Sequence, residues 1–501
     1  METSSENRIY KLISGAGQGL VGAIGGRVLG LAGNVFAARI LGPAVFGIYA
    51  IGWTLLRFFS IIAPLGTEKG VLQFAPKYFE KDDKSHKGLI LQALGISSIS
   101  GITFGVILFY LAPWLAEEIY HKPDLTAVFR YFSFVFPPIV LLAVISATTR
   151  TTQRVGYSVL LQDLGQPFLG LILMIVFYFM GLNLFGVVFA DVLSISMAAV
   201  IGLFILAKLF PNMFNKQIKP VFPGKNLLRF SIPASLAAAF VVYIFWIDRL
   251  LIGYFRTSYE NGIYQAASQI SMLFSVVLAG INLVVIPMFA DAHHKQDRET
   301  LQEVYCIATK WGIYFSIPAL VVLFVSPKEV LSFLYGTHYS GGAEALIILL
   351  LGQFLNLLTG SVNPLIVMTG NQNFLFRLSG VILIFDIAMN MILIPKFGLL
   401  GAAISTAFSL GGLFLIALVW AKINLGLWPY DKRYLKGFFA AVLSIVAVIL
   451  VKGSLPNAGL DLLFQGVAAV VIFGVSLFVQ KLDKEDMTFV LQIWKKISGK
   501  T

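Results

Sequence analysis

Residues 37–50 read AARILGPAVFGIYA, and a related pattern returns about 210 residues later, where residues 248–253 read DRLLIG and residues 261–264 read NGIY. The arginines of the two stretches are 210 residues apart and the tyrosines are 215 apart. A third match, shifted by 212, joins NLFG at 183–186 to PKFG at 395–398. Chance similarity between glycine-rich helices could give one such match. Three matches in order at nearly one spacing indicate a duplicated unit.

The composition predicts an integral membrane protein. Of the 501 residues, 58% are hydrophobic and 12% are charged, whereas soluble domains are about a quarter charged. The net charge of +12 comes from basic residues that lie between apolar runs, so membrane topology explains it better than nucleic-acid binding does. One cysteine, Cys306, excludes a disulfide framework and a cysteine metal cluster. No phosphate-binding loop of the Walker type is present, and we expect no metal or bound cofactor.

About 20 apolar residues cross a bilayer, and the sequence contains fourteen runs of this size. They lie near 12–39, 44–66, 88–112, 127–149, 157–181, 184–207, 228–254, 262–287, 303–326, 341–367, 374–395, 398–421, 434–452 and 459–480. The repeat spacing equals six runs. We therefore predict an all-α membrane fold with two pseudo-symmetric six-helix lobes and two additional C-terminal helices. The predicted parts are a first lobe at 1–210, a cytoplasmic linker at 211–227, a second lobe at 228–421, and helices 13 and 14 with a cytoplasmic tail at 422–501.

Positive charge is distributed unequally between the two sides of these spans. If the N-terminus is inside, 27 of the 37 Lys and Arg residues lie on the inner side and eight lie outside. Only Arg27 and Arg57 remain within spans. The bias follows the positive-inside rule. It predicts a multi-pass protein of the plasma (inner) membrane with both termini in the cytoplasm.

Two segments carry a resemblance to a known family. Residues 37–50 resemble the first-turn signature of polysaccharide transporters in the multidrug/oligosaccharidyl-lipid/polysaccharide (MOP) flippase superfamily. Residues 246–255, WIDRLLIGYF, followed by GIYQAA at 262–267, resemble the junction between spans seven and eight in the same family. The resemblance extends over essentially the whole chain, and it is fairly specific for the branch that contains O-antigen flippases.

The resemblance implies a flippase that moves a polyprenyl-diphosphate-linked oligosaccharide from the cytoplasmic to the outer leaflet by alternating access. Such a protein is not an enzyme. Its partners would be the lipid-linked oligosaccharide, membrane lipids and the glycan polymerase or glycosyltransferase machinery. The alternative is a small-molecule exporter of the multidrug-extrusion (MATE) type, driven by Na⁺ or H⁺. Cationic drugs would require carboxylates in the first-lobe cavity, whereas a diphosphate requires arginines.

Arg27 and Arg57 are the first candidates for binding the diphosphate. Arginine within a membrane span is costly and is therefore usually functional, and no acidic residue occurs in the first two spans. A guanidinium group can donate two parallel hydrogen bonds to phosphate oxygens. The alternative is that each arginine caps backbone carbonyls or reaches the membrane interface. Asn34 shares a helix face with Arg27 at helical spacing.

The remaining cavity candidates come from the seventh and eighth spans. We expect Arg249 at the mouth of the cavity, where it need not pair with the adjacent Asp248, and Trp246 one turn earlier could stack on a sugar. Gln269 and Asn282 belong to a polar set on the eighth span. Polar residues in membrane helices also hold helices together, so packing between helices is an equal alternative for them.

A cation site in the second lobe is a further hypothesis. Asp386 and Asn390 are one turn apart, and Thr406 lies at similar depth in the next span. Hard oxygen ligands suit Na⁺, and a lone carboxylate could carry H⁺ instead. The resemblance implies that some relatives couple to a cation in this lobe. The alternative is a structural aspartate bonded to neighbouring helices.

Overall fold

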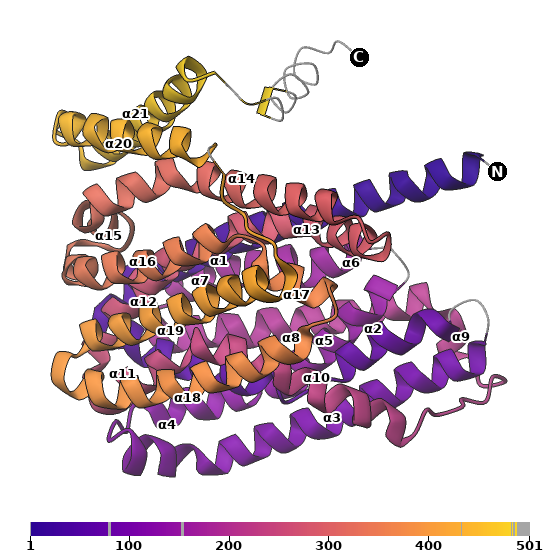
Figure 1. Ribbon diagram of the computed structural model, residues 1–501. Helices are drawn as coiled ribbons and strands as arrows, with labels where there is room; N and C mark the ends of the chain where they lie inside the picture. Colours follow the sequence, from indigo (N-terminus) through magenta and orange to yellow (C-terminus); the bar gives the residue numbers. More distant parts are fainter. Residues whose placement is uncertain are drawn as a thin grey trace.

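The computed structural model describes residues 2–78, 82–151, 155–431, 433–481, 483, 486 and 487 (Figure 1). The described chain forms helices joined by turns and short linkers; η1, η2 and η4 are π-helices and η3 is a 3₁₀ helix. In chain order they are α1 (Glu2–Ser60), α2 (Thr67–Tyr78), α3 (Asp83–Trp114), η1 (Leu115–Ile119), α4 (Leu125–Ser133), α5 (Phe136–Thr151), α6 (Val155–Ser158), η2 (Val159–Gly165), α7 (Gln166–Phe179), α8 (Asn183–Leu209), α9 (Pro211–Phe214), α10 (Lys225–Ile244), α11 (Ile247–Phe255), α12 (Ser258–Met272), α13 (Phe274–His294), α14 (Arg298–Val325), α15 (Pro327–Tyr335), η3 (Thr337–Gly342), α16 (Ala343–Thr359), α17 (Val362–Met368), α18 (Gln372–Phe397), α19 (Leu399–Trp420), η4 (Ala421–Leu425), α20 (Tyr434–Val451) and α21 (Ala458–Val479).

The helices account for the predicted spans. Within the described residues, twelve helices are long and apolar enough to cross a membrane, or thirteen when the bent pair α4 and α5 is taken as one span. That pair bends by 42° just before Pro137 and Pro138, which have no N–H to continue the helix ladder. Residues 24–60 enter this count once although α1 is broken at Gly42. When the two arms of α1 are counted separately, the thirteen spans become fourteen. The predicted all-α membrane fold is confirmed.

The break in α1 is set by two adjacent residues. Gly42 has φ 70° and ψ 167°, a backbone conformation that side chains disfavour, and Pro43 follows it without an N–H donor. Residues on both sides of the break line one cavity: Gly26 to Asn34 on the first arm and Tyr49 to Ile61 on the second. The chain therefore reverses at Gly42 and brings both arms to the centre of the molecule.

The repeated glycines meet where the two lobes touch. A Cβ atom on Gly47 of α1 would lie 1.7 Å from the carbonyl oxygen of Ser258, and one on Gly262 of α12 would lie 2.0 Å from that of Pro43. The Asn261 side chain donates to the Gly47 carbonyl at 3.2 Å. Small residues permit such close approach of membrane helices. The matched segments of the repeat thus seal one end of the lobe interface, which we call the Gly42 end.

We expect Gly47→Ala to open this seal. Ordinary contact of a Cβ atom begins at about 3.4 Å, so α1 and α12 must move apart to accept the methyl group. Spin labels placed on the two helices should report a longer distance in the variant. Gly95→Ala is the control, because a Cβ atom on Gly95 would meet nothing within 4 Å. Equal distances in the two variants would show that the seal does not depend on glycine.

The lobes also touch at the opposite end, which we call the α2 end. Lys69 of α2 donates to the Ala234 carbonyl of α10 at 2.8 Å. Nearby, the Tyr243 hydroxyl donates to the Phe58 carbonyl at 3.0 Å, and the two rings stack with their centroids 3.7 Å apart. The two lobes therefore touch at both ends of the space between them.

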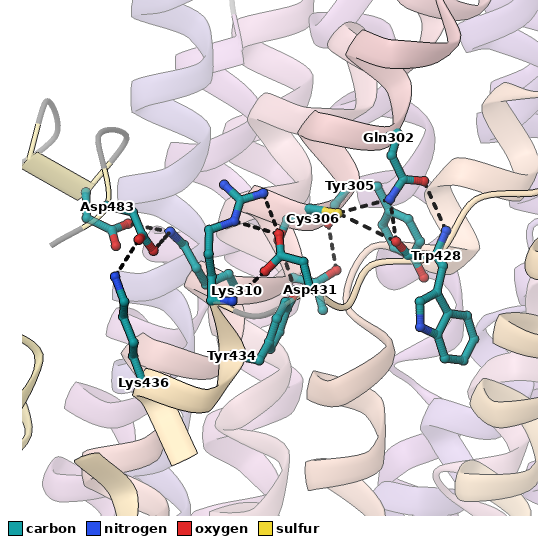
Figure 2. A network of polar contacts seen from close by, with 12 residues as sticks. Gln302, Tyr305, Cys306, Lys310, Trp428, Asp431, Tyr434, Lys436 and Asp483 are labelled. Carbon is teal, nitrogen blue, oxygen red and sulfur yellow. Dashed lines mark hydrogen bonds and ion pairs between the residues drawn. The ribbon is translucent and has the colours of Figure 1, made fainter. Parts of the chain in front are cut away.

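Helices α20 and α21 form a separate pair at the periphery, beside α14 (Figure 1). The linker before α20 is held to α14 by Gln302, whose amide donates to the Trp428 carbonyl and accepts from the Trp428 N–H at 3.0 Å (Figure 2). The Tyr434 hydroxyl then donates to the Cys306 carbonyl at 3.1 Å. These bonds fix the entry of the pair against the second lobe.

Charged residues hold the segment that follows α21. Lys310 of α14, which is 1% exposed, lies 3.3 Å from Asp483 and 2.9 Å from Asp486. Lys436 of α20 contacts Asp483 at 2.7 Å (Figure 2). Burial alone would raise the pKa of Asp483, but the hydrogen bond from Lys436 and the charge of Lys310 outweigh it, and the pKa is lowered. The carboxylate therefore stabilises the attachment only while it is ionised.

We expect acid to release this segment. A lowered pKa means that the stabilisation is complete above the ordinary Asp pKa of about 3.9 and is lost as the pH falls through the lower folded value. Limited proteolysis after α21 should accelerate below about pH 4. Asp483→Asn should already accelerate it at pH 7, whereas Asp82→Asn, remote from this cluster, should not. Identical cleavage in wild type and Asp483→Asn at every pH would contradict this role.

Candidate functional site

A cavity of about 530 Å³ lies between the two lobes. Its wall comes from both arms of α1, from α7 and α8 in the first lobe, and from α10, α12 and α13 in the second. Polar side chains from both lobes reach it; they are Arg27, Asn34, Tyr49, Trp53, Arg57, Ser60, Gln166, Asp191, Trp246, Gln269 and Ser275. A polar interior surrounded by apolar helices can replace the hydration of a head group that lipid would exclude.

The two span arginines both face this cavity. Arg57 is exposed to it, and its guanidinium lies 5.3 Å from the centroid of the Trp53 ring. No hydrogen bond or ion pair joins that guanidinium to another residue in the described part of the chain. Arg27 is also exposed and donates one hydrogen bond, 2.6 Å long, to the Ser275 hydroxyl across the lobe interface. Most of the donors of both groups remain available for an anion.

Tyr49, Trp53 and Arg57 form a stripe along the second arm of α1, at intervals of one helical turn. The Tyr49 and Trp53 rings stack, with an interplanar angle of 13°. The Tyr49 hydroxyl donates to the Asp191 carboxylate of α8 at 2.8 Å. Tyr49 and Asp191 are cavity residues that were not predicted from the sequence. The one-turn spacing of 49, 53 and 57 was a usable signal for the stripe, but nothing local links α1 to Asp191.

Three further predicted residues also line the cavity. Trp246, at the junction of α10 and α11, and Gln269 of α12 face it from the second lobe. Asn34 faces it from the first arm of α1, where its amide donates to the Gly30 carbonyl at 3.0 Å. The structure thus brings together Arg27, Arg57, Asn34, Trp246 and Gln269.

Arg249 is placed differently from the prediction. It is 1% exposed and does not line the cavity, so its predicted place at the cavity mouth is wrong. It pairs at 2.9 Å with the adjacent Asp248, a contact that the prediction regarded as not required. Gln265 and Ser268 of α12 accept from it at 2.6 and 2.5 Å. Its guanidinium lies over the Trp246 ring, 4.5 Å from the ring centroid. Trp246 lines the cavity and Arg249 does not. Arg249 is buried because α12 supplies acceptors that the local sequence does not show.

Asn282 also lies outside the cavity. Its side-chain oxygen accepts a hydrogen bond of 2.6 Å from Ser361, which immediately precedes α17. This contact joins α13 to the start of α17 and corresponds to the packing alternative for polar residues on the eighth span. Gln269 of the same polar set faces the cavity.

The three residues of the predicted cation site are buried, but they do not form one cluster. Asn390 contacts Asp386, whereas Thr406 contacts a second carboxylate, that of Asp248. Ser405 of α19 donates to Asp386 at 3.0 Å, and the Asn390 amide donates to the Asp386 carbonyl at 3.0 Å. Thr406 instead donates to Asp248 at 3.0 Å. Within the described residues, one carboxylate oxygen of Asp386 and the amide oxygen of Asn390 are buried without a hydrogen-bond partner, and so is the nearby Ser409 hydroxyl. Among the described residues, no group of three His, Cys, Asp or Glu side chains could hold a metal.

Two helical lobes around a polar cavity are an architecture typical of membrane transporters, and the comparisons with known proteins agree with that class. The chain belongs to the polysaccharide biosynthesis protein family, whose model matches residues 13–293, and the MatE family model matches residues 233–392. This places it in the MOP superfamily that the residues around the first turn indicated.

Individual relatives agree with this placement. The chain is 24% identical to a probable low-salt glycan biosynthesis flippase of Haloferax volcanii over 41% of this chain and 43% of that protein. It is 21% identical to a putative O-antigen transporter of Shigella flexneri over 74% and 88%. The curated relatives with the strongest similarity are matched over about half of their length. The solved structure of the lipid II flippase MurJ in an inward closed conformation has a similar fold, with a TM-score of 0.74, 16% identity, and coverage of 92% of this chain and 98% of that one.

Proposed function

We propose that the protein is a flippase that moves a polyprenyl-diphosphate-linked oligosaccharide from the cytoplasmic to the outer leaflet by alternating access. The observation that carries the proposal is the Arg57 guanidinium, which faces the cavity between the lobes and has no hydrogen-bond or ion-pair partner among the described residues. Asp191 lines the same cavity but makes no ion pair with Arg57, and an arginine among membrane helices without a bonded partner is costly. Such a group is retained most simply because an anionic ligand supplies the missing partner.

The charge of the cavity suits a diphosphate. Arg27 and Arg57 both line the space and together carry +2, close to the charge of a diphosphate diester. Each planar guanidinium can form charge-assisted hydrogen bonds to phosphate oxygens, about twice as strong as neutral ones. The names of the similar Haloferax and Shigella proteins support a glycan cargo.

The direction of transport follows from the predicted topology. We place the α2 end in the cytoplasm, because the positive-inside rule assigns that side to the links around Lys69 and Lys219. The Gly42 end then faces outward, and both termini lie in the cytoplasm. Cargo would enter when the α2 end opens and leave when the Gly42 end opens.

Deletion of the gene in its own cell tests the proposal. Lipid-linked oligosaccharide should accumulate in the inner leaflet, and the glycan it supplies should disappear from the cell surface. Wild-type protein should restore both. Normal surface glycan together with normal leaflet distribution in the deletion strain would reject this function. A genetic interaction with the glycan polymerase or glycosyltransferases would identify the partners that we propose.

A small-molecule exporter is the second candidate, supported by the MatE match at residues 233–392. Asp191 adds a carboxylate to the cavity, so the cavity is not lined by arginines alone. Its carboxylate already accepts from Tyr49, and two arginines leave the site net positive. A cationic drug would be repelled, and the charge balance therefore favours the diphosphate.

We also propose that a cation binds near Asp386 and Asn390 and drives the reorientation of the lobes. The unpaired oxygens of these two side chains support the proposal, and Asp248 with Thr406 lies in the same buried polar region. We expect Asp386→Asn to insert normally but to lose the dependence of transport on Na⁺ or pH gradients. Transport that keeps its full gradient dependence in this variant would contradict the site. The flip would then be driven by consumption of the glycan outside.

A further inference from the structure

We propose that Asp191, Tyr49 and Trp53 form a sugar subsite that accepts a neutral sugar next to the diphosphate and rejects an acidic one. This inference rests on the proposed flippase function and deepens it. It makes Asp191 a residue that determines which lipid-linked glycan is carried.

The cavity has two chemically different ends. Arg57 and Tyr49 are eight residues apart on α1, about 12 Å along the helix axis at 1.5 Å per residue. Trp53 lies between them, and all three line the cavity. On the antiparallel first arm Arg27 is again nearer the α2 end and Asn34 nearer the Gly42 end. Both arms therefore present a cation toward the α2 end and neutral polar or aromatic groups toward the Gly42 end.

A lipid-linked sugar has the same order of chemical groups. Its diphosphate precedes the first sugar, so a diphosphate held by Arg27 and Arg57 brings that sugar to the level of Trp53 and Tyr49. The stacked rings of Trp53 and Tyr49 offer an apolar surface with polar groups at its edge, which is the combination that aromatic side chains bring to binding sites. Trp246 and Gln269 line the same cavity from the second lobe.

Asp191 supplies the charge that makes the subsite selective. Its carboxylate is 5% exposed, lines the cavity, and is oriented by the Tyr49 hydroxyl on one oxygen. No hydrogen bond from another described residue reaches the second oxygen. A carboxylate is an acceptor only, so it can bind the hydroxyl or amide donors of a neutral sugar. A second carboxylate at the same position would meet a like charge in a partly desolvated site, where repulsion is strong.

The charged neighbours of Asp191 leave this selectivity intact. Arg57 and Tyr49 are the titratable groups that act on its carboxylate. The Arg57 guanidinium and the Asp191 carboxylate are more than 4 Å apart and form no ion pair. An anion bound at Arg57 therefore neutralises the arginine without occupying Asp191. The carboxylate remains available to the next group along the ligand.

Three synthetic probes test the subsite: farnesyl diphosphate, farnesyl diphosphate-glucose and farnesyl diphosphate-glucuronic acid. Binding to the purified full-length protein is measured at pH 8 by calorimetry or by competition with a labelled probe. Wild type should bind the glucose probe at least about tenfold more tightly than the glucuronic acid probe, as expected for like charges a few ångströms apart. Asp191→Asn should reduce that ratio to less than about threefold, and Tyr49→Phe should reduce it partly.

Asp163→Asn is the matched control, because Asp163 is a carboxylate of the same lobe that does not line the cavity. It should keep the wild-type ratio. If wild type binds all three probes but does not distinguish glucose from glucuronic acid, the subsite is wrong and the flippase function stands. The same holds if Asp191→Asn keeps the full ratio, because Asp191 then only braces Tyr49. If wild type binds none of the probes, the subsite and the flippase function both fail.

Discussion

Arg57→Ala should abolish transport of lipid-linked oligosaccharide while leaving the protein as stable as wild type. The guanidinium forms no hydrogen bond or ion pair with another described residue, so its removal breaks neither kind of bond and costs only its contact with the Trp53 ring and its longer-range attraction to Asp191. Hydrogen bonds to charged groups are worth about 1.5–3 kcal/mol each. Loss of one such bond weakens binding of the diphosphate by about 10-fold to 150-fold.

Further arginine variants show whether the positive charge alone or the planar shape of the guanidinium is required. Arg57→Lys should recover only part of the function, because lysine keeps the charge but cannot donate two parallel hydrogen bonds. Arg27→Ala should also fail in transport, although it additionally removes the contact with Ser275 across the lobes. Arg377→Ala is the control, since this arginine is exposed and lies outside the cavity. Complementation of a flippase-null strain measures all four variants. Full complementation by both alanine variants at 27 and 57 would place the diphosphate elsewhere.

Of the variants proposed here, Asp248→Ala should lower the stability of the folded protein most. It would leave the Arg249 charge, which is 1% exposed, without its ion-pair partner. It would also remove the acceptor of Tyr264 and Thr406, which donate to Asp248 at 2.5 and 3.0 Å. Breaking a buried pair on one side costs about 3–5 kcal/mol. The melting temperature in detergent should therefore fall by several degrees.

Two comparisons make this prediction specific. Asp291→Ala removes the partner of Lys295 in an ion pair that is more than 60% exposed, and its melting temperature should stay near that of wild type. The double variant Asp248→Leu/Arg249→Met should recover part of the loss, because it removes the unpaired charge, although Tyr264 and Thr406 still lack their acceptor. Equal melting temperatures for Asp248→Ala and Asp291→Ala would show that the buried pair does not support the fold.

The two tyrosines that match in the sequence repeat make the same kind of contact, but the groups around them differ. The matched tyrosines Tyr49 and Tyr264 each donate to a buried aspartate, Asp191 in the first lobe and Asp248 in the second. An arginine accompanies each aspartate. Arg57 faces the cavity, whereas Arg249 donates hydrogen bonds to Gln265 and Ser268 of α12. The repeat counterpart of Arg249 is Arg39, which donates to the Leu334 carbonyl at 2.7 Å, so neither of the two matched arginines lines the cavity.

Much of the fold could be predicted because it depends on local properties. Runs of apolar residues predict the spans, Gly42 and Pro43 mark the first reversal, and the spacing of the repeat predicts a division into two six-helix lobes. The cavity arginines could be predicted for a related reason. A charged side chain within an apolar span is costly in contact with lipid, so it is expected to face a polar space inside the protein. The partners of Arg249 and of Asn282 could not be predicted in the same way. They come from α12 and from Ser361, and packing between distant segments decides which polar groups meet.

Flipping by the purified protein in vesicles tests the central claim most directly. Vesicles are loaded in both leaflets with a polyprenyl-diphosphate-linked N-acetylglucosamine, and an added galactosyltransferase labels only the sugars on the outer surface. Wild-type protein should make the inner-leaflet substrate available to the enzyme, so labelling proceeds to completion, whereas vesicles with Arg57→Ala should stop at the outer-leaflet fraction. Labelling that stops at the same fraction with wild-type protein as in protein-free vesicles, under imposed Na⁺ and pH gradients of either direction, would contradict the account.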